Sequence, residues 1–407
     1  MNKTKQRQYA RLIARKGANI QKKQPVIINA QVDRYEFVNI LVDECYKAGA
    51  SEVTVNWGYQ PLTKLNVKYQ TEKVLSTIED WEIERVKHAA KVLPAMIYIE
   101  SSDPDGLAGI NQNKYAKAMQ KIRSVTKPIT DSMDNKHQWC IAAVPGEAWA
   151  KKLFPNVRKS VAIEMLWDAI LETSRAKGDA VANWDEHNKN LKNRCDYLNS
   201  LKLKKLHYTS SNGTDFTVGL LPKVNFLAGA EDTLSGVTYN PNIPSEEVFT
   251  SPDKNIADGV VVSTKPLSYQ GQLIENFKIW FENGKAVKVY AQKNQSLLEE
   301  MINTDECACR LGECALVPYD SPISNSGILF YNTLFDENAS CHLALGAGFN
   351  ECLEGFENKT LEECTEYGIN DSLIHVDFMI GSEDLDIVGT DENGKEIQIF
   401  KNGNWAF

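Results

Sequence analysis

The feature that most limits the fold is a change in the spacing of apolar runs near the middle of the chain. Before about residue 200, short β-branched runs alternate with longer segments whose apolar residues recur at helical spacing. After His207 the apolar runs follow one another closely. Alternating strands and helices favour a parallel sheet covered by helices, whereas closely spaced strands favour antiparallel sheets. The sequence therefore predicts two domains of different class.

The first half is predicted to be an α/β domain with a mostly parallel sheet, covering residues 1–200. Its predicted strands are 26–30, 52–57, 95–100 and 140–145. A helical face that ends at Gly49 lies between the first two strands and makes a βαβ unit. The turn after the first strand reads Asn-Ala-Gln-Val-Asp and lacks the glycine fingerprint of dinucleotide-binding proteins. The sequence therefore does not support a dinucleotide cofactor.

The second half, residues 201–407, is predicted to be a β-rich α+β domain. Its predicted strands are 216–221, 259–263, 277–281, 286–291, 387–390 and 396–400. Asn283-Gly284 and Asn393-Gly394 each separate two of these runs, and Asn-Gly is the strongest short hairpin signal. The charged, helical segment 184–205 is predicted to connect the two domains.

Charge and cysteine usage exclude several classes of protein. The 45 basic and 54 acidic residues give a net charge of -9, and the basic residues are scattered, so we expect no nucleic-acid partner. Residues 1–24 lack the apolar region of a signal peptide, and no apolar run approaches the ~20 residues of a membrane span. The nine cysteines, an odd number at irregular spacing, favour reduced thiols. We therefore expect a cytoplasmic protein without a membrane partner.

His375 and Asp377 are the first candidates for metal ligands. They lie in the apolar run 374–380, which reads as a strand, and residues i and i+2 of a strand project from the same face. An imidazole and a carboxylate that point together can supply two ligands to a divalent ion. Taken alone, the pair is more often a buried histidine that is salt-bridged to a neighbouring aspartate.

Four further residues have the right chemistry. Glu337 and His342 lie close together in one segment, and Glu313 and Glu247 each enter an apolar run. Taken singly, each glutamate also fits an edge or solvent-facing position. Together with His375 and Asp377 they form a set of carboxylates and imidazoles of the composition used by two-metal hydrolases.

Other catalytic and metal-binding chemistries have less support. Cys307, Cys309 and Cys314 lack a second Cys-x-x-Cys and a fourth ligand at structural-zinc spacing, so free thiols are favoured. The sequence contains no Gly-x-Ser-x-Gly nucleophile elbow and no His-Glu-x-x-His zinc motif.

Several segments, in order along the chain, resemble the aminopeptidase T and aminopeptidase S family of cocatalytic metallo-aminopeptidases. They are 101–104, 242–250, 263–267, 311–317, 332–346, 375–381 and 402–406. The resemblance covers essentially the whole chain. It implies removal of N-terminal amino acids from peptides by a cytoplasmic two-domain enzyme that forms homodimers.

The resemblance also implies the site. The enzyme would bind two divalent ions, such as Zn, Co, Mn or Mg, and its substrates would be peptides with a free N-terminus. The metal-site residues carried over by motif are Glu247, Glu313, Glu337, His342, His375 and Asp377. One of two glutamates, Glu313 or Glu337, would also accept a proton during catalysis.

One position departs from the family pattern. The family usually has a tyrosine seven residues after the first motif histidine, where this chain has Phe349. The loss of a phenol at this candidate catalytic position leaves an alternative open, a catalytically weakened homologue that binds metal or peptide. Water or another donor, Tyr269 being one candidate, is a second way to supply the missing hydroxyl. A small-molecule binding module with incidental ion pairs is a third class of protein, but it leaves the motif resemblance unexplained.

Overall fold

The computed structural model describes residues 2–270 and 272–407. The chain forms two compact units. Unit 1 comprises Met1–Asp185 and Ala230–Pro244, and unit 2 comprises Glu186–Gly229 and Ser245–Phe407. The chain therefore passes between the units three times.

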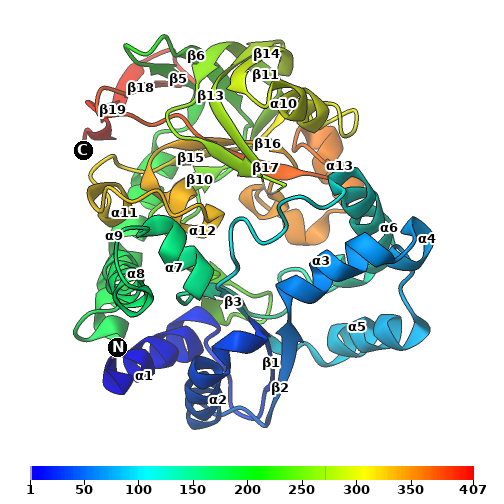
Figure 1. Ribbon diagram of the computed structural model, residues 1–407. Coiled ribbons are helices and arrows are strands. Elements are labelled where there is room, and N and C mark those ends of the chain that lie inside the picture. The colour runs from blue at the N-terminus through cyan, green and yellow to red at the C-terminus, as the bar shows by residue number, and fades with distance from the viewer. Residues whose placement is uncertain (1, 271) are drawn as a thin grey trace. The chain divides into compact units, whose positions relative to one another are not determined.

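Unit 1 is built on a five-stranded sheet in which all neighbouring strands are parallel (Figure 1). In spatial order the strands are β2 (Glu52–Gly58), β1 (Pro25–Gln31), β3 (Ala95–Glu100), β4 (Trp139–Ala143) and β9 (Asn242–Ile243). Along β1 and β3, buried and half-buried residues alternate. The predicted parallel sheet is confirmed. Its fifth strand, β9, comes from the segment Ala230–Pro244 and was not predicted.

Helices follow the strands of unit 1. They are α1 (Lys3–Leu12), α2 (Tyr35–Ala48), α3 (Gln60–Tyr69), α4 (Glu72–Leu75), α5 (Asp80–Val92), α6 (Gln112–Asp131), α7 (Glu147–Leu153) and α8 (Lys159–Thr173). In α2 the residues Phe37, Leu41 and Cys45 recur at helical spacing and are buried. The helix stops at Gly49, whose φ of 125° suits glycine at a helix end. A hairpin of β7 (Glu231–Asp232) and β8 (Thr238–Tyr239) also belongs to unit 1.

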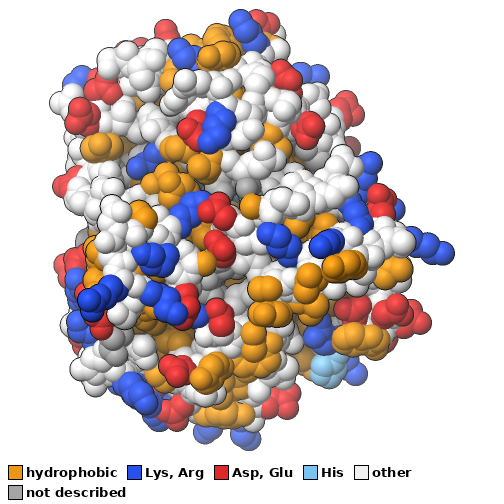
Figure 2. Space-filling view, in the orientation of Figure 1, with side chains coloured by type: hydrophobic (Ala, Val, Ile, Leu, Met, Phe, Trp, Pro, Cys, Tyr) orange, Lys and Arg blue, Asp and Glu red, His pale blue; other side chains and the backbone are white. Residues whose placement is uncertain are grey.

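Unit 1 also exposes apolar side chains. Figure 2 shows them gathered over α3 and α5, where Leu62, Leu65, Tyr69 and Trp81 are all about half exposed or more. Contiguous exposed apolar surface of this kind often marks a contact with another protein.

Unit 2 contains a nine-stranded antiparallel sheet. Its strands are β5 (Leu203–Thr209), β6 (Asp215–Leu220), β11 (Pro252–Val262), β12 (Leu267–Tyr269), β13 (Gln272–Glu282), β14 (Lys285–Lys293), β18 (Asp386–Asp391), β19 (Glu396–Lys401) and β20 (Asn404–Trp405). Both predicted hairpins form, β13 with β14 and β18 with β19. The first turns at Asn283 and Gly284, whose φ values of 49° and 79° suit these two residue types.

The predicted helical connection 184–205 needs one correction. The helix α9 (Ala180–Ser200) ends earlier, and Leu203 already begins β5. Lys202 has a φ of 51°, so helical geometry does not continue through it. In β5 the residues Leu206 and Tyr208 alternate inward while the lysines stay exposed, and this period of two is typical of a strand.

A second, four-stranded antiparallel sheet lies in unit 2. Its strands, in spatial order, are β10 (Val248–Thr250), β15 (Leu311–Leu316), β16 (His342–Gly346) and β17 (His375–Met379). One face packs into the main core through Leu343, Leu345 and Phe378, and the Phe378 ring lies 5.8 Å from that of Phe277 on the larger sheet. The other face is therefore free to carry polar side chains.

Short helices connect the strands of this part of unit 2. They are α10 (Gln295–Ile302), α11 (Pro322–Asn325), α12 (Thr333–Asp336), α13 (Leu361–Tyr367) and the 3-10 turns η3 (Glu337–Ala339), η4 (Asn350–Cys352) and η5 (Phe356–Asn358).

Candidate metal centre

The four-stranded sheet carries most of the residues predicted for the metal site. Glu313 lies on β15, His342 begins β16, and His375 and Asp377 lie on β17. Glu247 directly precedes β10. Residues from segments up to 130 positions apart in the sequence thus come together on one small sheet.

The strand register sets the spacing of these side chains. Ala344 of β16 pairs with Glu313 on one side and with Asp377 on the other, so these three residues form a row across the sheet. His375 pairs with Gly346, two residues further along the same face. Alanine and glycine at the centre leave space between the carboxylates and the imidazole.

A β-bulge brings Glu313 onto this face. Leu311 pairs with Leu345, but Glu313 pairs with Ala344, so Gly312 is the extra residue. Strict alternation would have placed Glu313 on the same apolar face as Leu311. A Cβ atom on Gly312 would lie 2.0 Å from the carbonyl oxygen of Ala347, so only glycine fits without a shift of backbone.

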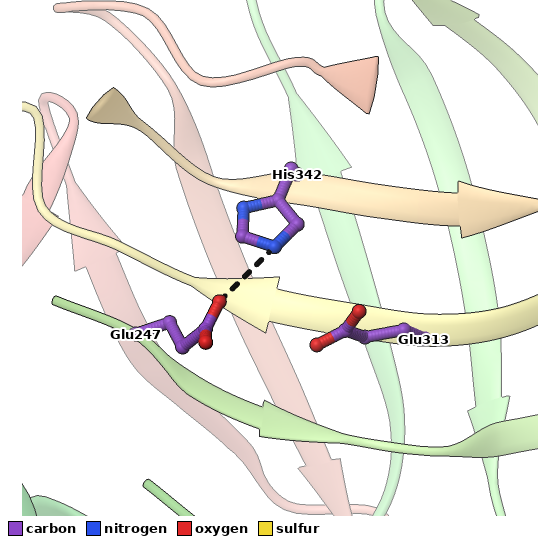
Figure 3. A group of neighbouring side chains, drawn as sticks. All are labelled: Glu247, Glu313 and His342. Carbon is purple, nitrogen blue, oxygen red and sulfur yellow. Dashed lines mark ion pairs between the residues drawn. The ribbon is translucent and has the colours of Figure 1, made fainter. Parts of the chain in front are cut away.

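The ligand atoms form two groups that share one residue. Glu247, Glu313 and His342 make one group and Glu313, His375 and Asp377 make the other, and within each group the potential ligand atoms lie within 4.8 Å of one another. The His342 Nε2 atom is 3.3 Å from a Glu247 oxygen, and these side chains point toward each other in Figure 3. His375 Nε2 is 3.2 Å from Glu313 and 3.3 Å from Asp377.

Backbone carbonyls orient both imidazoles. His342 Nδ1 lies 3.3 Å from the Ser340 oxygen, and His375 Nδ1 lies 2.7 Å from the Ala347 oxygen. A proton on each Nδ1 donates to these carbonyls and leaves each Nε2 facing the carboxylates. This second contact is typical of histidines that bind a metal through the other nitrogen.

The charged groups shift one another's pKa values. Burial raises the pKa of Glu313 to about 7. Burial opposes the charge on Asp377 and on His342, but the neighbouring His375 holds the pKa of Asp377 at about 2, and Glu247 raises the pKa of His342 to about 10. In the metal-free site, protons are therefore shared among the carboxylates and imidazoles. A bound cation would displace these protons.

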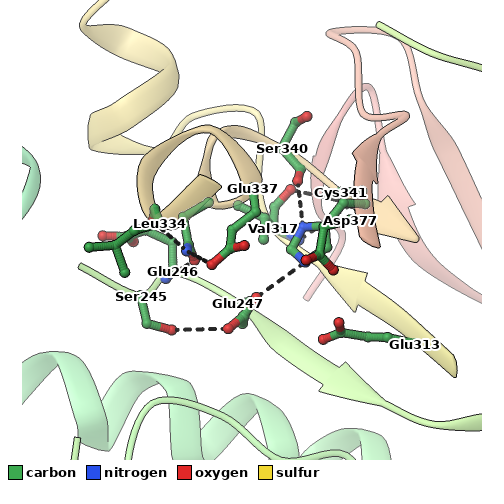
Figure 4. A network of polar contacts seen from close by, with 12 residues as sticks. Ser245, Glu246, Glu247, Glu313, Val317, Leu334, Glu337, Ser340, Cys341 and Asp377 are labelled. Atoms are coloured by element: carbon green, nitrogen blue, oxygen red, sulfur yellow. Dashed lines mark hydrogen bonds and ion pairs between the residues drawn. The ribbon is translucent and has the colours of Figure 1, made fainter. Parts of the chain in front are cut away.

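Glu337 lies beside the two groups but belongs to neither. Figure 4 shows its carboxylate directed toward the same space as those of Glu247, Glu313 and Asp377. Burial, with the charges of Asp377 and Glu247, raises the pKa of Glu337 well above its ordinary value. Glu337 therefore holds a proton more readily than an ordinary glutamate does.

Phe349 lies at the edge of the site. Its ring centroid is 5.0 Å from that of His375 and 5.1 Å from that of Phe249. The residue that lacks the family's hydroxyl therefore contacts one of the two candidate histidines, His375.

Sequence reasoning missed the residues that hold the candidates in place. Asn338 is fully buried, and its side chain accepts a hydrogen bond from the Glu246 backbone N–H at 2.7 Å. The carbonyls of Ser340 and Ala347 that orient the histidines carry no side-chain signal at all. Only the position of Asn338 beside Glu337 was visible in the sequence.

The donor set fits divalent cations. It combines carboxylate oxygens with imidazole nitrogens, which are the donors that divalent transition-metal ions accept. Two ligand groups that share Glu313 have the composition of a two-ion centre. A carboxylate-rich group of potential metal ligands on one face of a small antiparallel sheet, in a chain with a separate parallel α/β unit, has the composition used by metal-dependent hydrolases.

Comparison with known proteins gives the family. Residues 2–405 match the thermophilic metalloprotease (M29) family, and the chain belongs to it. It is 43% identical to aminopeptidase AmpS of Bacillus subtilis over 98% of each chain. It is 38% identical to aminopeptidase T of Thermus thermophilus over 98% of this chain and 97% of that protein. The predicted membership of a metallo-aminopeptidase family is confirmed.

Solved structures agree with this assignment. The structure of wild-type AmpT from Thermus thermophilus matches with a TM-score of 0.92 at 36% identity and covers 100% of both chains. This match confirms the predicted order of a parallel α/β part followed by a β-rich part. A 2,5-dihydroxypyridine dioxygenase from Pseudomonas putida matches with a TM-score of 0.52 at 12% identity, which shows a similar fold alone. Over the described residues, no helix has the length and apolar character needed to cross a membrane.

Proposed function

We propose that this protein removes N-terminal amino acids from peptides at a centre of two divalent ions, such as Zn, Co, Mn or Mg. The observation that carries the proposal is the pair of ligand groups that share Glu313. Relatives over nearly the full length are named aminopeptidases, which supports the choice of reaction.

Five residues would hold the ions. Glu247 and His342 would bind one, His375 and Asp377 the other, and Glu313 would bridge them. When bound, such ions lower the pKa of a water toward about 7 and polarise the scissile carbonyl. The carbonyls of Ser340 and Ala347 hold the two Nδ1 atoms, and the two Nε2 atoms would thereby stay available as ligands.

Glu337 would move the proton. It stands outside both ligand groups, and the surrounding acids make its carboxylate a good proton acceptor. In the proposed reaction a Glu337 oxygen takes a proton from the attacking water and then gives it to the nitrogen of the leaving amine. Glu313 is less suited to this role because His375 lies 3.2 Å from its carboxylate and both groups use it.

A free N-terminus would be recognised through its α-amine. Because two divalent ions would offset the charge of the carboxylates, the amine would be held after deprotonation by one of the ions, or while still charged by a spare carboxylate of the site. An internal peptide bond offers no such amine. Restriction to the first residue of a peptide would follow from this contact.

The test compares two substrates and two metal states. We expect the purified protein to contain divalent metal and to hydrolyse an aminoacyl p-nitroanilide, and we expect a chelator to stop the reaction. N-acetylation of the same substrate should abolish cleavage. Comparable rates for the acetylated and free substrates would overturn the aminopeptidase assignment.

The same measurements address the alternative of a weakened homologue. Phe349 in place of the family's tyrosine favours that alternative. Bound metal without turnover would select it over the enzyme.

The proposal extends to the setting of the enzyme. We place it in the cytoplasm because all nine cysteines are free, as in a reducing compartment. We also propose that residues 201–407 act as the catalytic domain and that the protein forms a homodimer. The exposed apolar side chains of α3 and α5 support self-association, which light scattering of the purified protein will test.

A further inference from the structure

Two of the candidate acids lie outside the strand pairing of the four-stranded sheet. Backbone pairing between β15, β16 and β17 fixes Glu313, His375 and Asp377 relative to one another. Glu247 precedes β10, and Glu337 begins η3. These two carboxylates come from segments 90 residues apart, so something other than the strand pairing must hold them together.

The side chain of Asn338 joins these two segments. It is fully buried, and its Oδ1 atom accepts the Glu246 backbone N–H at 2.7 Å. Its Nδ2 atom donates to the Leu334 carbonyl at 3.1 Å and lies 3.4 Å from a Glu337 oxygen. The Ser321 hydroxyl, 3.3 Å away, donates to the carbonyl of Asn338. One amide therefore contacts the residue next to Glu247 and the carboxylate of Glu337.

The amide side chain of asparagine suits this position better than a carboxylate or an apolar side chain of similar size. An amide has an acceptor for the backbone N–H and a donor for the carboxylate, whereas a carboxylate lacks the donor. An apolar side chain would remove the acceptor of the buried Glu246 N–H, and an unpaired buried donor is destabilising. Position 338 therefore needs a group that both accepts and donates.

We propose that Asn338 is a positioning residue that couples the placement of Glu247 to that of Glu337. It thereby sets the affinity of the ion position made by Glu247, Glu313 and His342. The inference rests on the proposed function, since it assumes that this position binds an ion. The second position uses only strand residues of β15 and β17, so Asn338 should not affect it.

The experiment compares Asn338→Ala with a matched control, Asn199→Ala. The Asn199 side chain also accepts a backbone N–H at 2.7 Å and donates to a carbonyl at 3.1 Å, both on Phe226, but it touches none of the six site residues. Metal-free proteins are titrated with Zn²⁺ by calorimetry. We expect Asn338→Ala to keep one ion at the parental affinity and to bind the other about 10–100-fold more weakly. Asn199→Ala should bind both ions as the parent does.

A second measurement does not depend on metal. Hydrogen exchange of the Glu246 amide in the metal-free protein should be faster in Asn338→Ala and unchanged in Asn199→Ala. Asn338→Asp carries the test if the alanine variant does not fold. It keeps the acceptor for Glu246 and loses the donor toward Glu337, so exchange at Glu246 and both ion affinities should stay near parental while kcat falls.

The outcomes separate this inference from the proposed function. Parental affinity for both ions in Asn338→Ala, or parental kcat in Asn338→Asp, would overturn the coupling and leave the proposed function intact. Equal weakening of both positions, or the same effect in Asn199→Ala, would show a general structural role and also overturn it. A parent protein that binds no Zn²⁺, Co²⁺ or Mn²⁺ would overturn the proposed function and this inference with it.

Discussion

The five-stranded sheet of unit 1 and the four-stranded sheet of unit 2 use their faces in different ways. In the first, parallel strands are followed by helices, and Ile28 and Ile97 are buried among apolar neighbours. In the second, one face enters the core while the other presents Glu313, His375 and Asp377. The comparison teaches that an antiparallel sheet with one buried face can gather charged side chains on its other face. They can come from neighbouring strands, as Glu313 and Asp377 do, or from alternate positions of one strand, as His375 and Asp377 do. Among the residues that the structure describes, the members of both groups of potential metal ligands lie on that sheet, except Glu247, which directly precedes its strand β10.

The largest expected effect comes from removing a ligand on the four-stranded sheet. We expect Asp377→Ala or His342→Ala to lower metal occupancy and activity together, by more than the roughly 10–100-fold typical of residues that only support a ligand. Elemental analysis and steady-state kinetics measure both. His88→Ala, an exposed position on α5 of unit 1, is the control and should change neither. Full occupancy and unchanged kinetics in the first two variants would show that the ligand assignment is wrong.

The next effect distinguishes the role of Glu313, on strand β15, from the role of Glu337, at the start of η3. If Glu337 moves the proton, Glu337→Gln should lower kcat by about 10²–10⁴-fold while the ions remain bound. Glu313→Gln should instead release metal, because both ligand groups contain Glu313. The two variants are compared by metal content and kcat. Loss of metal in Glu337→Gln would make that residue a ligand and remove it from the role of proton acceptor.

A smaller gain is expected at Phe349, which contacts His375 at the edge of the site. A hydroxyl that bonds the transition state contributes on the order of 3 kcal/mol, or about a hundredfold in rate. Phe349→Tyr should therefore raise kcat by up to this factor, with metal occupancy nearly constant because the ring keeps its shape. An unchanged kcat, with activity already high in the parent, would show that water or another donor such as Tyr269 supplies the hydrogen bond.

The smallest expected effect is a dependence of metal affinity on pH. Glu313, with a pKa of about 7, and His342, with a pKa of about 10, both hold protons in the metal-free protein at pH 6. Metal binding must displace them, so affinity should rise by about tenfold or more from pH 6 to 7. Titrations against a competing chelator at both values measure the change. An affinity that does not vary with pH would contradict this proton balance.

The sequence predicts the framework of both units well. Alternating burial in β1 and β3 and the Asn-Gly turn at Asn283 are local patterns, and local patterns are what a sequence shows directly. The two-residue strand β9 was not predictable, because it is too short to carry a pattern and pairs with β4 from a distant segment.

The site was predictable by residue type but not by geometry. A strand that follows strict alternation would place Leu311 and Glu313 on one face, and only the bulge at Gly312 separates them. The role of Asn338 depends on a contact with Glu246, 92 residues away. Such tertiary contacts leave no periodic trace in the chain.

The shared, carboxylate-rich face of the four-stranded sheet has a further consequence for ion selectivity. Glu247, Glu313, Glu337 and Asp377 carry four negative charges when ionised, and two divalent ions carry four positive charges. If two divalent ions bind as proposed and the imidazoles are neutral, the loaded cluster would be electroneutral, whereas monovalent or trivalent ions would leave a net charge in a poorly solvated place. The number of acids would then select the valence of the ion, and its chemical identity would depend on the supply of metals around the protein.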